Sequence, residues 1–240
     1  MNVALIIAGG SGSRMGQDIP KQFINVHDKP VIIYTLESFQ NHPLIDSIEV
    51  VCIDGWHDVL KAYAKQFGIT KLKWVVSGGQ TGQESIRNGV YNLEGQINGD
   101  DIVIIHDGIR PLVDSSILTD VINKCEQYGN AVTSLPYNEQ IFIVDENSPD
   151  TTTRFIPRET LRRVSTPQAY KFDLLNSKYH EAFEKKIGIY GSSYTNTMMV
   201  ELGVTLHFAS GSEKNIKLTT KDDLEMFKSY IKLEKDTWLK

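Results

Sequence analysis

The feature that most constrains the fold stands at the start of the chain, where the short apolar run 3–8 passes directly into the glycine-rich segment 9–16. Small and β-branched residues that end in glycines are typical of a buried strand in a parallel sheet. At the carboxyl end of such a strand, glycine N–H groups can approach a phosphate because no Cβ stands in the way. Arg14 and Lys21 add positive charge, so this stretch predicts a nucleotide triphosphate site. The residues expected to contact the nucleotide here are Ala8, Gly9, Gly10, Gly12 and Ser13.

The glycines alone also allow simpler interpretations. A glycine cluster after a strand often forms only a tight turn into a helix. The spacing of Gly10, Gly12 and Gly16 is not the dinucleotide-binding fingerprint, and no acidic residue closes a first βαβ unit about twenty positions on. No Gly-Lys-Ser/Thr ends the loop, so it is not a P-loop either. The glycines alone therefore leave a simple turn as an alternative to a phosphate-binding loop.

Strand-like and helix-like segments alternate through most of the chain. Apolar runs that fit strands cover 47–53, 71–76, 101–105, 131–136 and 204–208, and segments that fit helices cover 30–39, 58–67, 116–128, 172–183, 192–202 and 222–231. Such alternation predicts an α/β fold, with a mostly parallel sheet sandwiched by helices. With 240 residues and 40% hydrophobic content, the chain can bury the core of one domain that spans residues 1–240.

Composition argues against several classes of protein. The net charge is −5 and the basic residues are scattered, so no nucleic-acid partner is expected. No apolar stretch approaches the length that spans a bilayer, and the chain enters a strand without a leader pattern, so we expect a cytoplasmic protein with no membrane partner. Cys52 and Cys125 lie in apolar patterns and predict buried, reduced thiols rather than a disulfide or a metal site.

A second glycine-bearing loop, residues 77–89, follows the third strand-like run and opens a helix. Because the carboxyl ends of parallel strands meet at one edge of the sheet, both glycine loops are expected to face one crevice. Gly79 and Ser85 are the candidate contacts to the base and ribose. The alternative is that Thr81 or Ser85 only caps or lines the helix.

The tip of the fourth strand-like run carries the most specific chemistry. Asp107 would point into the crevice, where an unpaired carboxylate is costly unless a cation meets it. Mg²⁺ bridging the phosphates is the predicted cation, and Arg110 is suited to hold a phosphate of a second substrate through a forked pair of hydrogen bonds. An Asp107–Arg110 ion pair that only fixes the turn is the alternative. His106 fits a packed ring better than a base.

The alternation of strand-like and helix-like segments is interrupted between residues 137 and 157. Two short apolar runs, 140–144 and 151–156, flank a turn-rich segment and predict a β-hairpin. A lone hairpin is marginally stable in water, so it is expected to pack on something. We predict that 137–157 is a protruding arm that reaches the neighbouring subunit of a homodimer.

Seven elements in order along almost the whole chain resemble one family. They are 9–16 with Arg14, Pro20-Lys21-Gln22, Gly78-Gly79 with Ser85, 106–111, Arg158, Thr166-Pro167-Gln168 and Asn215-Ile216-Lys217. The set resembles the family that contains 2-C-methyl-D-erythritol 4-phosphate cytidylyltransferase and ribitol-5-phosphate cytidylyltransferase. The resemblance implies a Rossmann-like, nucleotide-diphospho-sugar transferase-like fold with a dimerisation arm, and a CTP-dependent enzyme of the cytidylyltransferase type.

Two positions differ from the pattern of that family. Residues 138–140 read Asn-Glu-Gln where the family usually carries Asp-Thr, and residues 195–197 read Thr-Asn-Thr where it carries an Asp. The Asn196 amide can offer Mg²⁺ an oxygen but no charge. These differences favour a polyol phosphate of the D-ribitol 5-phosphate type as acceptor, with the methylerythritol phosphate as the alternative. A pocket near Ala8, Gly9, Gly79 and Ser85 would suit a pyrimidine base, so UTP is the alternative to CTP as nucleotide.

The implied reaction transfers CMP from CTP to the polyol phosphate and releases pyrophosphate, giving a CDP-alditol such as cell-envelope polysaccharide synthesis uses. Such a transfer depends on positioning and on neutralising negative charge rather than on a base. The resemblance implies Arg14, Lys21 and Lys217 as catalytic residues, Asp107, Arg110, Arg158 and Thr166 at the acceptor, and Asp107, with Asn196 as a second candidate, at Mg²⁺. A non-catalytic nucleotide-binding regulator and a Rossmann-type oxidoreductase are the alternatives from other classes.

Overall fold

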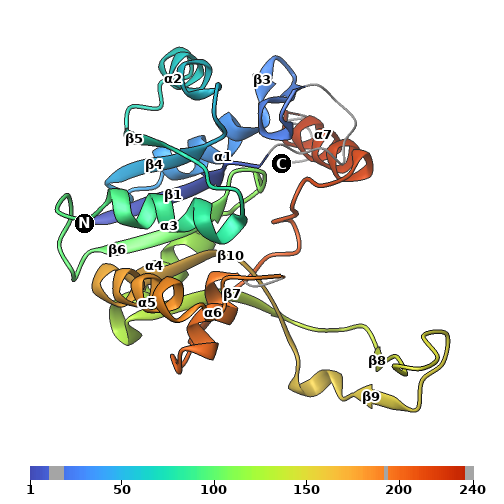
Figure 1. Cartoon of the computed structure of the whole chain (residues 1–240). Helices are drawn as coiled ribbons and strands as arrows, with labels where there is room; N and C mark the ends of the chain where they lie inside the picture. Colours follow the sequence, from blue (N-terminus) through green and yellow to red (C-terminus); the bar gives the residue numbers. More distant parts are fainter. Residues whose placement is uncertain (11–18, 192–193, 236–240) are drawn as a thin grey trace.

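The computed structural model describes residues 1–10, 19–191 and 194–235 (Figure 1). Its central sheet has seven strands: β1 (Asn2–Ala8), β4 (Ser47–Cys52), β5 (Leu72–Ser77), β6 (Ile102–Asp107), β7 (Asn130–Pro136), β10 (Arg162–Lys171) and β11 (Phe208–Ser210). They are ordered β11-β7-β10-β6-β1-β4-β5 across the sheet. The pairs β6–β1, β1–β4, β4–β5 and β11–β7 are parallel, whereas β10 runs antiparallel to both of its neighbours. The sheet is therefore mostly parallel, as predicted.

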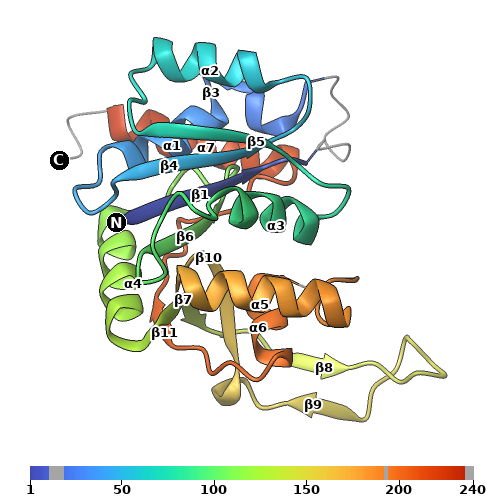
Figure 2. The ribbon, with the colours of Figure 1, turned by 60° about the vertical axis from the view of Figure 1, so that its left-hand side comes forward.

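Helices cover both faces of this sheet. In chain order they are α1 (Val31–Gln40), α2 (His57–Gln66), α3 (Gly82–Asn92), α4 (Ser115–Tyr128), α5 (Phe172–Lys185), α6 (Thr195–Glu201) and α7 (Lys221–Lys235). Side chains of α1, α2 and α4 belong to one buried cluster, and those of α3, α5 and α6 to the cluster on the opposite face. Figure 2 shows α3 and α5 in front of the strands, with α1 behind them.

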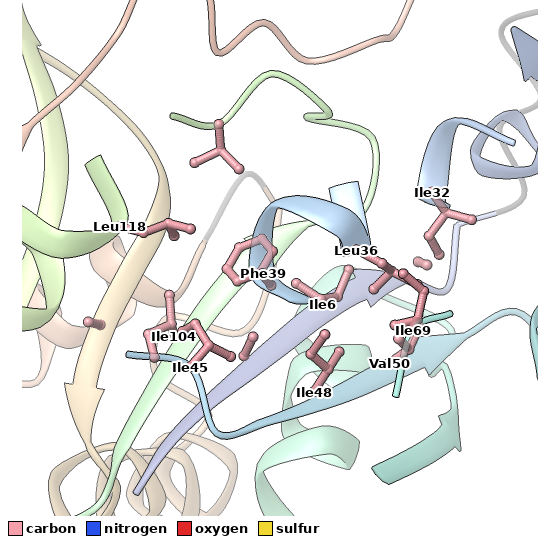
Figure 3. Packing of buried hydrophobic residues seen from close by; sticks show 14 of the residues in the cluster. Ile6, Ile32, Leu36, Phe39, Ile45, Ile48, Val50, Ile69, Ile104 and Leu118 are labelled. Carbon is pink, nitrogen blue, oxygen red and sulfur yellow. The ribbon is translucent and has the colours of Figure 1, made fainter. Parts of the chain in front are cut away.

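The strand β1 shows why both faces can be covered. Ala4 and Ile6 belong to the cluster with α1, whereas Val3 and Leu5 belong to the cluster with α3, because successive side chains of a strand point to opposite faces. All four are completely buried. Figure 3 shows Ile6 packed among Leu36 and Phe39 of α1 and Ile48 of β4, together with the other side chains of that cluster. A strand buried on both faces needs an unbroken apolar run, which is what 3–8 supplies.

A hairpin made of β8 (Ile141–Ile143) and β9 (Arg154–Ile156) projects from the body of the molecule (Figure 1). It corresponds to the segment in which the sequence predicted a hairpin. Phe142 and Phe155 face each other across it and are 56% and 67% exposed. A second, smaller hairpin joins β2 (Asn25–Val26) and β3 (Lys29–Pro30).

The largest difference from the expected elements is β10, which was not predicted as a strand. Its first half carries Arg162 and Arg163 in exposed positions, whereas residues 167–170 are buried between β6 and β7. The late strand predicted at 204–208 lies further on, at β11. The helix predicted from 192 is described from Thr195. Within the described part of the chain, no helix is both long and apolar enough to cross a membrane.

Candidate active site

A cavity of about 900 Å³ opens where β1 and β6 end, between the loop after β5 and the amino end of α6. Among the residues on its wall are these predicted site residues: Ala8, Gly9, Gly10, Lys21, Gly79, Ser85, Asp107, Arg110, Thr166, Asn196 and Lys217. One cavity thus gathers residues from seven separate stretches of sequence. The predicted residues Gly12, Ser13 and Arg14 lie outside the described residues.

The first loop is held in place by a residue that the sequence placed in a motif but not in the site. Gln22 is almost completely buried in the short 3-10 helix Lys21–Phe23. Its Nε2 donates hydrogen bonds to the carbonyl oxygens of Ala8 at 2.8 Å and Gly10 at 3.0 Å. The Pro-Lys-Gln segment therefore fixes the path of the glycine loop and carries Lys21 to the cavity wall.

Close contacts surround one glycine in each of the two glycine loops. A Cβ on Gly9 would lie 3.2 Å from the Cα of Gly78, and a Cβ on Gly79 would lie 2.3 Å from the Cβ of Glu84. The second of these distances is impossible without moving the backbone of α3. Glycine is required at position 79 and relieves a tight contact at position 9, and both Gly9 and Gly79 lie on the cavity wall.

The amino end of α3 is capped as the simpler interpretation proposed. The hydroxyl of Thr81 accepts a hydrogen bond from the backbone N–H of Glu84 at 3.1 Å, and the Glu84 carboxylate accepts one from the Thr81 N–H at 3.1 Å, which forms a capping box. The hydroxyl of Ser85 accepts from the Gly79 N–H at 3.0 Å and donates to the Thr81 carbonyl at 2.9 Å. Ser85 thus shapes the second loop and also lies on the cavity wall.

At the centre of the site, one carboxylate holds two cations. Asp107 Oδ2 accepts from Nε of Arg110 at 2.9 Å, and Asp107 Oδ1 accepts from Nζ of Lys217 at 3.2 Å. Burial opposes the charge on Asp107, but Lys217 and Arg110 outweigh that effect, so the pKa of the Asp107 carboxyl lies below its ordinary value. The ion pair with Arg110, which the sequence left as an alternative, is therefore present. The pairing with Lys217 was not foreseen.

A second set of hydrogen bonds ties the end of β6, the middle of β10 and the loop between β11 and α7 together around this carboxylate. The backbone N–H of Asp107 donates to the Thr166 hydroxyl at 3.2 Å, and Nδ2 of Asn215 donates to the Thr166 carbonyl at 2.6 Å. Arg110 completes the link by donating from Nη1 to the Asn215 carbonyl at 2.6 Å. Asn215 is a positioning residue that sequence reasoning did not single out, although it stands beside Lys217 in the Asn-Ile-Lys element.

The structure does not bring every predicted residue to this cavity. Arg158 lies in the 3-10 helix Arg158–Thr160 beside the arm, where Nη1 donates to the Asn138 carbonyl at 3.0 Å, and it is not on the cavity wall. His106 is completely buried, and burial lowers its pKa to about 4, so it is a neutral packed ring as expected. Cys52 and Cys125 are free and buried, and burial raises the pKa of their thiols to about 11 and about 12.

The donor groups do not form a ready-made magnesium site. Asp107 is the only carboxylate among the described residues of the cavity wall, and a cation already occupies each of its oxygens. The Asn196 amide oxygen accepts from the Thr197 N–H at 2.9 Å. The described residues contain no group of three or more His, Cys, Asp or Glu side chains arranged to hold a metal ion. Mg²⁺ prefers six oxygen ligands, so these residues alone do not fit it.

Comparison with known proteins identifies the family. The family model described as IspD, 2-C-methyl-D-erythritol 4-phosphate cytidylyltransferase, matches residues 2–233. The chain belongs to this cytidylyltransferase family. It is 60% identical to the ribitol-5-phosphate cytidylyltransferase of Lacticaseibacillus paracasei over 97% of this chain and 98% of that protein. It is 34% identical to the 2-C-methyl-D-erythritol 4-phosphate cytidylyltransferase of Clostridium novyi over 96% of each chain.

Solved structures support the fold independently. The 4-diphosphocytidyl-2C-methyl-D-erythritol synthase of Anaerococcus prevotii matches with a TM-score of 0.82 over 97% of this chain and 96% of that one, at 21% identity. The 2-C-methyl-D-erythritol 4-phosphate cytidylyltransferase of Thermus thermophilus matches with a TM-score of 0.74 over 97% of this chain and 100% of that one, at 23% identity. The predicted α/β fold and the predicted CTP-dependent cytidylyltransferase are both confirmed.

Proposed function

We propose that this cytidylyltransferase transfers CMP from CTP to D-ribitol 5-phosphate, forming CDP-ribitol and pyrophosphate. The observation that carries the acceptor is the 60% identity to a ribitol-5-phosphate cytidylyltransferase, against 34% to a methylerythritol phosphate cytidylyltransferase, each over nearly the whole chain. The wall of the cavity supports the same class of substrate, because Lys21, Arg110 and Lys217 bring positive charge to a space that also offers neutral polar groups.

The reaction follows from charge and position. A phosphate oxygen of the acceptor attacks the α-phosphorus of CTP, a new P–O–P bond forms, and the bond from that phosphorus to the β-phosphate bridging oxygen breaks to release pyrophosphate. The acceptor phosphate is already ionised near neutral pH, so no side chain has to remove a proton. We assign Lys21, Lys217 and Arg14 to stabilise the charge on the reacting phosphates. Ala8, Gly9, Gly79 and Ser85 would enclose the base and ribose, and Arg110 and Thr166 the acceptor phosphate.

Asp107 has a role in this scheme that does not depend on a metal. Because its carboxylate holds Lys217 and Arg110 at 3.2 and 2.9 Å, both cations are kept at the cavity wall before substrate binds. An arriving triphosphate offers them stronger partners than one carboxylate, so we propose that they turn to phosphate oxygens. Preorganised cations of this kind cost little rearrangement when charge develops.

Mg²⁺ is proposed as part of the CTP complex rather than of the protein alone. Divalent magnesium usually keeps several waters and binds through one or two carboxylates plus the phosphates of a nucleotide, where it neutralises phosphate charge. Asp107 is the described carboxylate that could join it once Lys217 or Arg110 has moved to a phosphate.

We also propose that the protein is a homodimer in which the arm, residues 137–157, forms the contact between subunits. The exposed side chains of Phe142 and Phe155 on a two-stranded hairpin are unfavourable in water and suit a second copy of the arm. Arg158 adjoins the arm and stays outside the cavity of its own chain. Its proposed contact with the acceptor therefore requires the cavity of the partner subunit. A cytoplasmic location, where CTP is made, stays a prediction from the sequence.

The experiment that tests the proposed function is a matrix of nucleotides and acceptors. Purified protein with Mg²⁺ is given CTP, UTP, ATP or GTP together with D-ribitol 5-phosphate, D-arabinitol phosphate, glycerol 3-phosphate or 2-C-methyl-D-erythritol 4-phosphate, and pyrophosphate release is followed. We expect the highest kcat/KM for CTP with D-ribitol 5-phosphate. A higher value for the methylerythritol phosphate would overturn the proposed acceptor, and equal use of UTP would overturn the proposed nucleotide.

A further inference from the structure

A buried row of polar side chains runs behind the cavity wall opposite the Asp107 cluster. It consists of Gln83 of α3, Tyr179 of α5 and Thr195 of α6, which are 4%, 0% and 2% exposed. Gln83 and Thr195 lie on the cavity wall, and Tyr179 connects them from inside the core. Figures 1 and 2 both place α5 beside α6, so the row crosses between neighbouring helices.

Hydrogen-bond distances along the row are short. Gln83 Nε2 donates to the Gly188 carbonyl at 2.7 Å, the Tyr179 hydroxyl donates to Gln83 Oε1 at 3.0 Å, and the oxygens of Tyr179 and Thr195 lie 2.7 Å apart. Gly188 is itself fixed, since its φ is +63° and a Cβ there would lie 2.7 Å from the Cα of Met198. Its carbonyl is therefore a fixed end of the row.

The direction of every proton in the row follows from that carbonyl. A carbonyl can only accept, so the amide nitrogen of Gln83 must face Gly188 and its Oε1 must face Tyr179. Because Oε1 can only accept, it takes the single proton of the Tyr179 hydroxyl. The bond between Tyr179 and Thr195 must then carry the proton of Thr195. Burial raises the pKa of the Tyr179 hydroxyl well above its ordinary value, so titration near neutral pH does not reverse the row.

Thr195 consequently has no proton left for the cavity. Toward the cavity the Thr195 oxygen can therefore present only a lone pair, which can accept a hydrogen bond from a substrate but cannot donate one. An ionised phosphate oxygen has no proton to give, whereas a hydroxyl has. The cavity wall at Thr195 therefore suits a hydroxyl, while the cations around Asp107 suit phosphate.

We propose that Tyr179 is a positioning residue that turns Thr195 into an obligatory hydrogen-bond acceptor, and that Thr195 reads one hydroxyl group of a substrate. This inference rests on the proposed function, because both substrates of that reaction carry hydroxyls, the alditol along its chain and CTP on its ribose. The two sources share one chemistry, and the experiment below distinguishes them.

The test compares substrates that lack one hydroxyl at a time. One arm uses the four mono-deoxy analogues of D-ribitol 5-phosphate with CTP, and the other uses 2′-deoxy-CTP and 3′-deoxy-CTP with D-ribitol 5-phosphate. In the wild-type protein we expect kcat/KM to fall by about tenfold or more for one analogue, as is usual when a site loses a hydrogen bond it was built to make. The arm in which this analogue occurs identifies the source of the hydroxyl.

Variants then test whether the fall in kcat/KM for that analogue depends on the row of Gln83, Tyr179 and Thr195. Thr195→Val removes the accepting oxygen, so the variant should treat the analogue and its parent within about threefold of each other, whereas Thr195→Ser should discriminate as the wild type does. Tyr179→Phe should reduce the discrimination at least about threefold, because the freed Thr195 proton no longer fixes the direction of its oxygen. Tyr34→Phe is the matched control, since it removes a tyrosine hydroxyl bonded to the Val26 carbonyl at 2.7 Å outside this cavity wall.

Several outcomes would overturn the inference. One is a Tyr179→Phe variant that keeps the full wild-type discrimination at the position where Thr195→Val loses it. Another is a wild-type protein that treats every analogue like its parent. If Tyr179→Phe does not fold, the contrast between Thr195→Val and Thr195→Ser decides. A failure of the proposed function can be distinguished from a failure of this inference, because D-ribitol 5-phosphate itself would then be a poor acceptor. In that case the deoxy analogues of the preferred acceptor, together with the two deoxy-CTP analogues, would still test Thr195.

Discussion

A carboxyl group buried within the sheet makes the stability of this protein depend on pH. Glu49 of β4 is completely buried, its Oε1 accepts from Nδ2 of Asn92 at 3.0 Å, and its Oε2 has no partner among the described residues. Burial raises the pKa of Glu49 to about 8, although the hydrogen bond from Asn92 opposes the change. Folded protein therefore keeps a proton on Glu49 at neutral pH, whereas the unfolded chain, with an ordinary pKa of 4.5, loses it.

The size of the effect follows from linkage between proton binding and unfolding. Between pH 4.5 and about 8 the folded state binds more protons than the unfolded state, so the free energy of unfolding falls as pH rises. The gap between about 8 and 4.5 corresponds to about 5 kcal/mol in total, at about 1.4 kcal/mol per pH unit. This stability is fully present below pH 4.5, and we expect about 2–3 kcal/mol of it to be lost between about pH 5 and pH 7.

Glu49→Gln removes the titration and keeps the shape. The amide oxygen can accept from Asn92 as Oε1 does, and the amide does not ionise in the unfolded chain. Urea unfolding of the variant and the wild type at pH 5, 6, 7, 8 and 9 gives a difference in free energy in which all other titrating groups cancel. That difference should grow in favour of the variant by about 2–3 kcal/mol from about pH 5 to pH 7, and by about 1 kcal/mol more by about pH 9.

A matched control separates burial from the loss of a carboxyl group as such. Glu126 is exposed on α4, so Glu126→Gln should remain parallel to the wild type across the same pH series. A difference between Glu49→Gln and the wild type that stays constant from pH 5 to pH 9 would refute the reasoning, because it would mean that Glu49 ionises alike in the folded and unfolded states.

Three further predictions concern the site and the arm. Lys217→Ala should lower kcat/KM about a hundredfold, because the site loses a preorganised positive charge. Lys214 is exposed and lies off the cavity wall, so Lys214→Ala should stay near wild type. Equal activity of both variants in a pyrophosphate-release assay would contradict the role of Lys217. Calorimetric titration of Mg²⁺ into the protein without CTP should give no heat beyond that of dilution, and measurable binding would show a preformed metal site. Phe142→Ser combined with Phe155→Ser should convert a dimer to a monomer in sedimentation experiments, and an unchanged mass would exclude the arm as the interface.

The sequence predicted the strands that can be recognised from their own residues alone. β1 and β6 are unbroken apolar runs because helices cover both of their faces, and such runs are visible without any partner. β10 was missed because its exposed first half reads as a charged surface segment, with Arg162 and Arg163 in series. What makes it a strand is pairing with β6 and β7, which are tens of residues away in the chain.

The members of the site were more predictable than their pairing. Glycines, lysines and an aspartate at strand ends identify a phosphate site by residue type, and the cavity wall contains those that the structure describes. Which groups contact each other depends on the path of the chain. Asp107 and Lys217 are 110 positions apart in the sequence, and Gln83 and Tyr179 are 96 positions apart. No local sequence pattern predicts either contact.

The two sides of the cavity together favour a phosphorylated polyol over a free phosphate or an unphosphorylated sugar alcohol. On one side Arg110 and Lys217 outnumber the single carboxylate of Asp107, so that side carries net positive charge until phosphates arrive. On the other side Gln83 and Thr195 are neutral; one amide proton of Gln83 is bonded to the Gly188 carbonyl, and the Thr195 hydroxyl is bonded to Tyr179. A free phosphate would satisfy only the first side, and a bare alditol only the second. Each side therefore favours a substrate that carries its matching group.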